Sequence, residues 1–560
     1  TDLIVAMHKV FDVEKDPFIF DVSHQAYAHK LLTGRWDDFD TLRQFKGVCG
    51  YTKPSESKYD YYVAGHSSTS ISLAVGAAKA IALKGEDRIP VAFIGDGSMS
   101  AGMVYEAMNE LGDRKYPVVI ILNDNEMSIA KPIGAISKLL SQTMAGSFYQ
   151  KFKGKVEKTL EYFPESATYM AKRFEESFKL ITPGILFEEM GIEYIGPVDG
   201  HDIEALVETM EVAKEFGKPV IIHAQTTKGK GYEIAEGTKE HWHGVSAFDL
   251  KTGESPKKSS AKAATAIFSE TLVALADEDE KVVGVTAAMP SGTGMSAVME
   301  KYPERFWDVA IAEQHAVTSM GPLAKEGFKP FCTIYSTFLQ RGYDQVIHDI
   351  ALMDLGVAFA MDRAGIVGED GETHQGVFDI SYLRAIPNMT LFAPYNESTM
   401  KAAMRFAKEY NHPCAFRYPR GAFLAEDRES PVFELGKSVL LEEGEEILLI
   451  GYGNGVGRAE QTAALLDKEV AILDLRFVKP LDREMLTTLS GTYKKWYVFS
   501  DSAKQGGVGS AILEFLSEEN ISDISLTSFE YDDAFITHGN TKLVEESLGI
   551  LPEQLAKQIL

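Results

Sequence analysis

The chain has 560 residues, of which 45% are hydrophobic and 25% are charged; this balance excludes both a mostly disordered chain and a fibrous one. Its formal net charge of −26 argues against nucleic acid or an anionic membrane as a partner, because both favour clustered lysine and arginine. The length predicts more than one domain.

The cysteines and the apolar stretches bear on the cellular compartment. Cys49, Cys332 and Cys414 are widely spaced, which indicates neither a disulfide framework nor a cysteine-based zinc site. No stretch approaches about 18 consecutive apolar residues, so no membrane span is expected. We therefore expect a cytoplasmic protein. An amphipathic helix is expected over residues 3–11, at the very start of the chain, so we also expect a natural N-terminal segment to precede it.

Short apolar runs, each followed by a turn and then by a helical pattern, recur along the chain. Such runs are typical of strands buried on both faces, and their alternation with helices predicts parallel sheets built from βαβ units. We predict strands at 91–94, 118–122, 220–222, 282–285, 356–361, 389–392, 447–450, 470–473 and 496–499. Polar segments at 251–262 and 427–431 divide the chain into domains of residues 1–260, 261–430 and 431–560. The predicted fold class is α/β, with three doubly wound, mostly parallel-sheet domains.

Two polar motifs follow neighbouring predicted strands in the first domain. Gly95-Asp96-Gly97-Ser98 follows strand 91–94, and Asn123-Asp124-Asn125-Glu126-Met127 follows strand 118–122. Because one crossover joins these strands, we expect their ends to meet at one edge of a sheet. Asp96, Asn125 and a backbone carbonyl near Met127 can then bind a hard cation such as Mg²⁺. Each motif alone is also a common turn sequence, whereas the pair at this spacing favours a diphosphate site.

This pair of motifs resembles the thiamine diphosphate signature of the transketolase-like superfamily. The resemblance implies that Asp96, Asn125 and the Met127 carbonyl hold Mg²⁺, which bridges the diphosphate. It also implies a carboxylate, in a different domain, that hydrogen-bonds the aminopyrimidine so that the cofactor can deprotonate its own thiazolium carbon. Glu313, at the end of the run 306–312, resembles that carboxylate. Taken alone, the pattern favours a first-turn glutamate stabilised by the helix dipole; beside the diphosphate motifs it favours the catalytic role. Phe338 would stack on the pyrimidine, or else be a core aromatic.

Four further segments narrow the resemblance. Residues 21–30, 65–72, 365–375 and 417–421 resemble, in colinear order, the family of 1-deoxy-D-xylulose-5-phosphate synthases. Members of this family condense pyruvate with glyceraldehyde 3-phosphate, release CO₂, and supply isoprenoid, thiamine and pyridoxal phosphate synthesis. The resemblance implies thiamine diphosphate and Mg²⁺ as cofactors and a homodimer. In the family, a Gly-His segment implicated in proton transfer lies upstream of the point where this chain begins.

The resemblance also assigns roles to individual residues. Histidines suit proton relay near neutral pH, and arginines suit a phosphate, although each arginine could equally be a surface ion-pair member. The catalytic group implied is Glu313, His374, Asp370, His24 and His243. The cofactor contacts implied are His24, Gly65, His66, Ser67, Asp96, Gly97, Ser98, Asn125, Met127, Lys228, Glu313 and Phe338. The substrate contacts implied are Tyr335, Arg341, Arg363, Asp370, His374 and Arg420.

Several features are assigned to structure, and two other functions stay open. His201 is expected in a turn before a helix capped by Asp202, and His315 is left unassigned. The glycine-rich segment 447–457 does not match a dinucleotide fingerprint and is expected to be a strand-to-helix turn. No residue of the third domain, which resembles the dimer-supporting transketolase C-terminal domain, is assigned a catalytic role. The alternatives are a transketolase-type ketol transferase, which releases no CO₂, and a non-catalytic sensor or scaffold that binds thiamine diphosphate.

Overall fold

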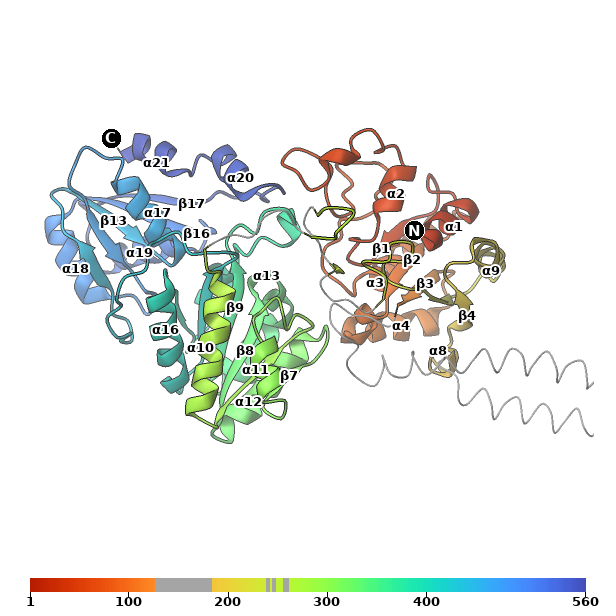
Figure 1. Cartoon of the computed structure of the whole chain (residues 1–560), viewed down its shortest axis with the longest axis horizontal. Coiled ribbons are helices and arrows are strands. Elements are labelled where there is room, and N and C mark those ends of the chain that lie inside the picture. The colour runs from red at the N-terminus through yellow and green to blue at the C-terminus, as the bar shows by residue number, and fades with distance from the viewer. Residues whose placement is uncertain (126–183, 238–241, 244–247, 255–260, 560) are drawn as a thin grey trace, which may run out of the picture. The chain divides into compact units, whose positions relative to one another are not determined.

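The computed structural model describes residues 1–125, 184–237, 242–243, 248–254 and 261–559. It divides the chain into two compact units (Figure 1). The first consists of Thr1–Leu42 and Val48–Lys257, and the second of Arg43–Gly47 and Lys258–Leu560. Among the described residues, the first unit contains one sheet and the second contains two. Met127 lies outside the described residues.

The sheet of the first unit is parallel throughout. Its strands, in spatial order, are β1 (Phe18–Phe20), β2 (Val91–Gly95), β3 (Val119–Asp124), β5 (Val220–Gln225) and β4 (Glu193–Asp199). Alternate residues of each strand point to opposite faces, so Ala92 and Ile94 enter one core and Val91 and Phe93 another.

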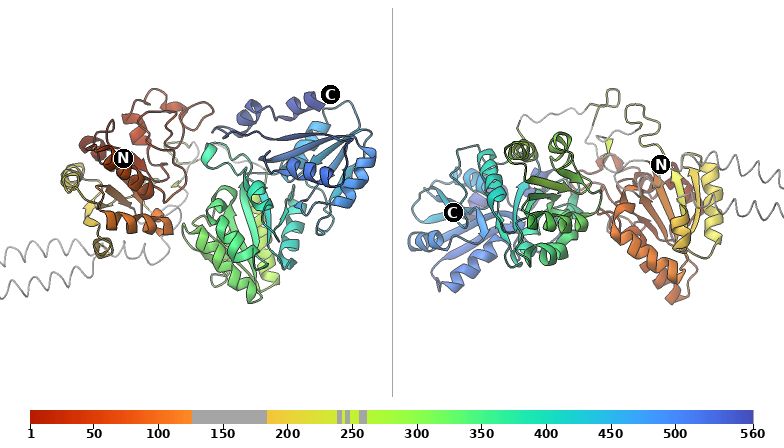
Figure 2. Two further views of the ribbon diagram at one scale, coloured as in Figure 1. Left: turned by 180° about the vertical axis from the view of Figure 1, so that it is seen from behind. Right: turned by 90° about the horizontal axis from the view of Figure 1, so that it is seen from below.

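Helices lie on both sides of this sheet, as Figure 2 shows in two further views. One face is covered by α3 (Ser70–Lys84), α4 (Gly102–Arg114) and α8 (Gly184–Glu189). The other is covered by α1 (Asp2–Val10) and α9 (Ile203–Glu215). The short helices α2 (Tyr27–Leu32), η1 (Phe39–Thr41) and η2 (Gly97–Ser100) belong to loops. Asp202 caps α9 by accepting a hydrogen bond from the Ala205 N–H, as predicted.

The middle sheet has seven strands, of which β15 alone among the described strands of this sheet is antiparallel to its neighbour. Their spatial order is β15 (Phe477–Lys479), β10 (Thr390–Phe392), β11 (Cys414–Pro419), β9 (Ala358–Ala364), β8 (Lys329–Tyr335), β6 (Val282–Thr286) and β7 (Phe306–Asp308). One face packs against α10 (Ala264–Glu278), α11 (Ser296–Lys301) and α16 (Glu397–Glu409). The opposite face packs against α12 (Glu313–Lys325), η6 (Val346–Ala351) and α15 (Asp379–Arg384). Three short helices follow β8 in the chain, namely α13 (Ser336–Leu339), η5 (Gln340–Gly342) and α14 (Tyr343–Gln345), and η7 (Gly371–Thr373) follows β9.

The C-terminal sheet is the third layer. Its strands, in spatial order, are β12 (Val439–Glu442), β14 (Ala471–Asp474), β13 (Ile447–Gly451), β16 (Lys495–Ala503) and β17 (Ser525–Tyr531), and β12 is antiparallel to β14. Helices α17 (Asn454–Ala463) and α21 (Pro552–Ile559) pack on one face. Helices α18 (Arg483–Thr492) and α19 (Val508–Glu518) pack on the other, and α20 (Thr541–Ser547) follows β17. The segment 447–457 is a strand-to-helix turn, as predicted.

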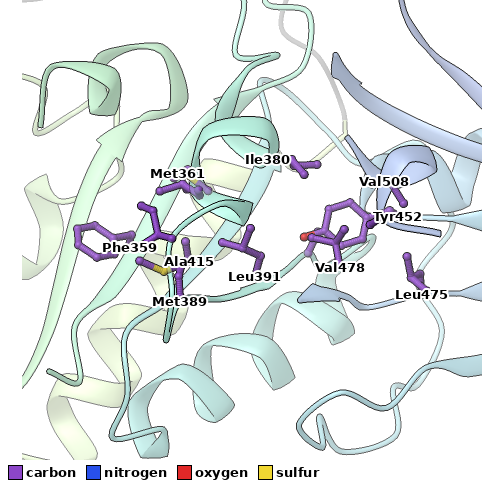
Figure 3. Packing of buried hydrophobic residues seen from close by; sticks show 14 of the residues in the cluster. Phe359, Met361, Ile380, Met389, Leu391, Ala415, Tyr452, Leu475, Val478 and Val508 are labelled. Atoms are coloured by element: carbon purple, nitrogen blue, oxygen red, sulfur yellow. The ribbon is translucent and has the colours of Figure 1, made fainter. Parts of the chain in front are cut away.

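One hydrophobic core joins the middle and C-terminal sheets. Figure 3 shows Phe359, Leu391 and Ala415 of the middle sheet in the same cluster as Tyr452 and Val508 of the C-terminal region. Strand β15, which follows β14 in the chain, pairs with β10 of the middle sheet. The two sheets of the second unit are therefore built around shared apolar side chains.

The predicted fold class is confirmed, since every described sheet is mostly parallel with helices on both faces. Each predicted strand is present. Most agree with the prediction within about two residues, whereas β5, β9 and β16 end three or four residues beyond their predicted ends. The prediction missed strands whose apolar runs are short or interrupted, namely β1, β4, β8, β11, β12, β15 and β17. In β17 the first half alternates between exposed and partly buried residues. The division into domains of residues 1–260, 261–430 and 431–560 stays a prediction.

Candidate active site

The ends of β2 and β3 bring the two polar motifs of the first unit together. The strands are parallel neighbours, with Gly95 opposite Asn123. The backbone N–H groups of Gly97 and Asn125 donate hydrogen bonds to the Asp96 carboxylate. Asp96 is 4% exposed, and burial together with the nearby Asp124 carboxylate raises its pKa to about 8. Such a carboxylate is suited to a cation, which would offset the cost of ionising it in this position.

The side chains of Asn123 and Asp124 are held by the neighbouring strand. The Thr226 hydroxyl donates to Asn123 Oδ1 at 2.7 Å, and His223 Nε2 lies 2.8 Å from Asp124 Oδ2. Tyr194 in turn contacts His223 Nδ1 at 2.8 Å. The side chains of Asn123 and Asp124 are therefore tied to this neighbouring strand, while the Asn125 N–H donates to the Asp96 carboxylate.

A second loop of the first unit contains Gly65, His66 and Ser67, and a buried aspartate shapes it. The Asp21 carboxylate accepts hydrogen bonds from the Ser68 and Ser70 N–H groups, at 2.7 and 3.2 Å. The Ser68 hydroxyl donates to the Ser98 carbonyl at 2.8 Å. The loop is thereby joined to the Gly97-Ser98 turn, so the residues predicted to contact the cofactor in these two segments are brought together.

His24, His243 and Lys228 form a third group in the first unit. The rings of His24 and His243 lie 4.9 Å apart between centroids. Burial, with the nearby His24 and Lys228, lowers the pKa of His243 to about 3. His243 is therefore neutral at physiological pH. The Lys228 loop is positioned by His201, whose Nε2 accepts a hydrogen bond from the Thr227 N–H at 2.8 Å.

In the second unit, Glu313 lies at the first turn of α12, shortly after β7. It is 5% exposed, and its burial raises the pKa of the carboxyl group, an effect that Arg341 partly opposes. Arg341 Nη1 lies 3.7 Å from Oε2. Within the described residues, Oε2 accepts no hydrogen bond. Burying a carboxylate oxygen without a hydrogen-bond donor reduces the stability of a fold. Such an oxygen is therefore expected where a ligand supplies the donor. His315, two residues further on, is exposed.

The end of β8 gathers aromatic and cationic side chains. The Phe338 ring stacks on Tyr335 at 5.4 Å and meets the His374 ring edge-on at 5.4 Å. The Arg363 guanidinium lies 4.3 Å from the centre of the Tyr335 ring and donates to the Gly292 carbonyl at 2.5 Å. The structure thus brings Tyr335, Phe338, Arg363 and His374 together, while Arg341 forms an ion pair with Glu313.

Asp370 lies among positive charges. Arg43 Nη1 is 2.5 Å from Asp370 Oδ1, and Arg420 Nη1 is 3.8 Å from Oδ2. Burial opposes ionisation, but His374, Arg43 and Arg420 outweigh it and lower the pKa of Asp370. Arg420 also donates to the Val367 carbonyl at 2.6 Å, and its side chain is 42% exposed. The result is an ionised carboxylate surrounded by cationic groups that face solvent in part.

Sequence reasoning missed three residues that position the candidate groups: Asp21, Arg43 and His223. Asp21 follows β1, a three-residue strand too short to be predicted. Arg43 belongs by sequence to the first domain, yet the segment Arg43–Gly47 folds with the second unit. His223 directly follows the predicted strand 220–222 and lies inside β5, where the signal available was a histidine at the end of an apolar run.

The fold and these strand-end groups define a transketolase-like protein. A family model described as 1-deoxy-D-xylulose-5-phosphate synthase matches residues 1–226. Models described as the transketolase pyrimidine binding domain and the transketolase C-terminal domain match residues 260–424 and 436–555.

Curated relatives are similar over the whole chain. The 1-deoxy-D-xylulose-5-phosphate synthase of Sulfurimonas denitrificans is 69% identical, with 100% of this chain and 93% of that protein covered. The Nitratiruptor sp. enzyme of the same name is 70% identical with the same coverage, and that of Helicobacter pylori is 62% identical, with 100% and 91% covered. The chain belongs to the 1-deoxy-D-xylulose-5-phosphate synthase family and is a transferase of the transketolase type. This family depends on thiamine diphosphate.

The described helices also bear on membrane association. None of those in the described part of the chain combines the length and the apolar character that a bilayer crossing requires.

Proposed function

We propose that this protein condenses pyruvate with D-glyceraldehyde 3-phosphate to 1-deoxy-D-xylulose 5-phosphate and CO₂, using thiamine diphosphate and Mg²⁺. The product would enter isoprenoid synthesis and supply thiamine and pyridoxal phosphate synthesis. The observation that carries the proposal is the buried Glu313 carboxylate, whose Oε2 accepts no hydrogen bond among the described residues. Membership in the family supports the choice of substrates.

The first unit supplies groups that fit a magnesium-bound diphosphate. Asp96 and Asn125 are adjacent at neighbouring strand ends, and their oxygens are of the type that Mg²⁺ prefers. We assign the metal to Asp96, Asn125 and the Met127 carbonyl. Gly65, His66, Ser67, Gly97, Ser98 and Lys228 would contact the cofactor. Because the pKa of Asp96 is raised, a bound cation would favour its ionised form.

Glu313 fits a role toward the pyrimidine ring. When bound, thiamine diphosphate supplies a carbon nucleophile and an electron sink for decarboxylation. Glu313 would hold a proton shared with a pyrimidine nitrogen through its Oε2, and its burial would keep water from competing for that hydrogen bond. Arg341, 3.7 Å away, would keep the carboxylate oriented. Phe338 would lie against the ring.

The remaining candidates fit the substrates. Neutral His243 and its neighbour His24 can donate or accept a hydrogen bond without adding charge. Asp370 and His374 would orient the reacting carbonyl groups and move protons at their oxygens. Tyr335, Arg363 and Arg420 would bind the phosphate of the aldehyde, where an arginine fork matches the oxygens.

The decisive experiment uses pyruvate labelled at its carboxyl carbon together with glyceraldehyde 3-phosphate. We expect labelled CO₂ and a five-carbon ketose phosphate, both dependent on thiamine diphosphate. The transketolase-type alternative predicts ketol transfer from xylulose 5-phosphate to an aldose phosphate with no CO₂. The sensor alternative predicts saturable cofactor binding and no CO₂ from pyruvate. Three further predictions stay with this proposal: a homodimer, a cytoplasmic location, and the three-domain division.

A further inference from the structure

A short loop of the second unit carries Asp370 and His374. Its two ends, Gly365 and Gly376, form a pair of backbone hydrogen bonds of 2.7 and 2.8 Å. We call residues 365–376 the 365–376 loop. Inside it, the His374 N–H donates to the Gly371 carbonyl at 2.9 Å. The loop is therefore closed at Gly365 and Gly376, which we call its base, and we call Gly371 its tip. Its position depends on the contacts made by the base and by the tip.

Apolar residues of the C-terminal region lie beneath this loop. Ile366, in the loop, and Val377, the residue directly after it, are buried in one cluster with Tyr531, Ile536, Val544 and Ile550. The Ala503 N–H, at the end of β16, donates to the Val377 carbonyl at 2.8 Å. Main-chain and apolar contacts thus join the base of the loop to the C-terminal sheet.

A buried ionic group holds the same base. Arg417 of β11 is 3% exposed and forms ion pairs with Asp379 and with Asp501 of β16. Its Nη2 donates to the Gly376 carbonyl at 3.1 Å. Gly365, with a φ of +76°, lies so close to Asp501 that an added Cβ would be 2.5 Å from Oδ2. Asp501 thereby reaches both ends of the loop: it lies directly against Gly365, and through Arg417 it is connected to Gly376.

The segment after β17 contacts the rest of the loop, including its tip at Gly371. Gln375 Nε2 donates to the Thr537 carbonyl at 3.2 Å, and the Gly539 N–H donates to the Gly368 carbonyl at 3.1 Å. His538, which is 4% exposed, packs on Gly371: a Cβ there would lie 2.8 Å from the His538 Cβ. His538 Nε2 also lies 3.1 Å from the Gly47 carbonyl, at the end of the segment that carries Arg43.

We propose that the C-terminal sheet region sets the position of the substrate-binding 365–376 loop, and that Asp501 and His538 are positioning residues for the reaction. Neither residue is assigned to touch substrate. Asp501 acts through Arg417 and the loop base, and His538 acts through Gly371 at the tip. The inference rests on the proposed function for the substrate roles of Asp370 and His374, and it gives the C-terminal sheet a part in catalysis.

The test compares Asp501→Asn with a matched control, Asp474→Asn. Asp474 is also a buried aspartate of the C-terminal sheet paired with an arginine, with Oδ2 3.1 Å from Arg476 Nε. Its arginine contacts residues 430–432 instead of the loop. In the Asp501→Asn chain we expect amide hydrogen exchange of residues 366–375 to accelerate about tenfold. The KM for glyceraldehyde 3-phosphate should rise about tenfold with a smaller change in kcat. Asp474→Asn should leave both readouts within about twofold of the wild type.

His538→Ala tests the tip independently and replaces Asp501→Asn if that variant does not fold. It should accelerate exchange in residues 368–374 and raise the same KM. Wild-type exchange over the loop in a folded Asp501→Asn or His538→Ala chain would overturn the proposal, as would equal acceleration by Asp474→Asn. If the wild-type chain makes no 1-deoxy-D-xylulose 5-phosphate, the proposed function fails while the exchange measurements still decide whether the loop is positioned this way.

Discussion

The middle and C-terminal sheets of the second unit are alike in architecture and different in what their strand ends carry. In the middle sheet, strands β7, β8, β9 and β11 lead to Glu313, Tyr335, Arg363 and Arg420. In the C-terminal sheet, β14 and β16 carry Asp474 and Asp501, each paired with a buried arginine. A parallel sheet offers the same kind of edge in both cases. The side chains placed there decide whether the edge binds a ligand or holds the fold together.

The contrast is clearest in how the buried carboxylates are satisfied. Asp474 lies 3.1 Å from Arg476 Nε and also accepts from the Arg476 N–H at 3.1 Å. Glu313 has a more distant cation, at 3.7 Å, and an oxygen without a donor among the described residues. Structural pairs are expected to be satisfied within the protein, whereas a group awaiting a ligand is not.

Replacing Glu313 is the strongest test of this contrast. For Glu313→Ala we expect kcat to fall by at least about 1,000-fold, because the carboxylate partner of the pyrimidine is lost. Mg²⁺-dependent binding of thiamine diphosphate should stay within a few-fold, since Asp96 and Asn125 are unchanged. Release of CO₂ and calorimetric binding measure the two effects. The control, Asp474→Asn, should retain kcat, and near-wild-type CO₂ release from Glu313→Ala would refute the assigned role.

Replacing Asp96 extends the comparison to the first sheet, whose edge should behave like that of the middle sheet. Asp96→Ala removes a proposed metal ligand, so we expect the affinity for thiamine diphosphate in Mg²⁺ to fall more than about 100-fold. Titration calorimetry measures it. Asp113→Ala, at an exposed site in α4 of the same unit, should bind normally. Equal affinities for Asp96→Ala and Asp113→Ala would remove the metal assignment.

Replacing Arg420 separates the two substrates. In Arg420→Ala we expect the KM for the phosphorylated aldehyde to rise about tenfold or more, as a charge-assisted hydrogen bond is lost. The KM for pyruvate should change far less. Steady-state kinetics with each substrate varied in turn gives both values. Arg428→Ala removes a comparably exposed arginine paired with Glu460 and serves as control. A similar rise in both KM values would place Arg420 away from the phosphate.

The sequence predicted what lies in short contiguous segments. Asp96, Asn125 and Glu313 each follow an apolar run, so their place after a strand could be predicted from periodicity and turn residues alone. Arg420 follows β11, whose apolar run is interrupted by Arg417, and that strand was not predicted. The contacts between distant segments could not be predicted. Arg43 and Asp370 are 327 residues apart. No local sequence pattern indicates that Arg43–Gly47 belongs to the second unit while the residues on either side belong to the first.

The same limit applies to the C-terminal sheet. Its pattern predicted a strand at 496–499, and β16 extends from there to Ala503. Nothing in the local sequence shows that Asp501 faces Gly365 and Arg417. Such pairings follow from how three chain segments pack, and packing depends on the whole set of buried side chains rather than on any one segment.

The smallest effect expected concerns His8, a partly buried polar group that has no proposed role in the reaction. His8 Nε2 lies 3.0 Å from His29 Nδ1, and His29 Nε2 lies 3.1 Å from Asp60. Burial and the neighbouring His29 lower the pKa of His8 to about 4. Between this value and the ordinary pKa of about 6.5, the unfolded chain binds more protons than the folded chain. The stabilisation by neutral His8 is therefore complete above pH 6.5 and is lost as the pH falls toward 4.

At pH 5, we expect the first unit to be less stable than at pH 7.5 by about 1–2 kcal/mol on account of His8. Denaturant-dependent hydrogen exchange of peptides from β2 and β3 reports this unit alone. His8→Gln should lose measurably less stability on acidification, with kcat unchanged at pH 7.5. His348→Gln, which removes a surface histidine of the second unit whose pKa is raised by Asp349, should show the full wild-type loss in the first unit. If His8→Gln loses as much as His348→Gln, another group controls the acid sensitivity of this unit. A fall in kcat for His8→Gln at pH 7.5 would instead mean that His8 affects the reaction. The distinction between structural and ligand-binding groups would then not hold in the first unit.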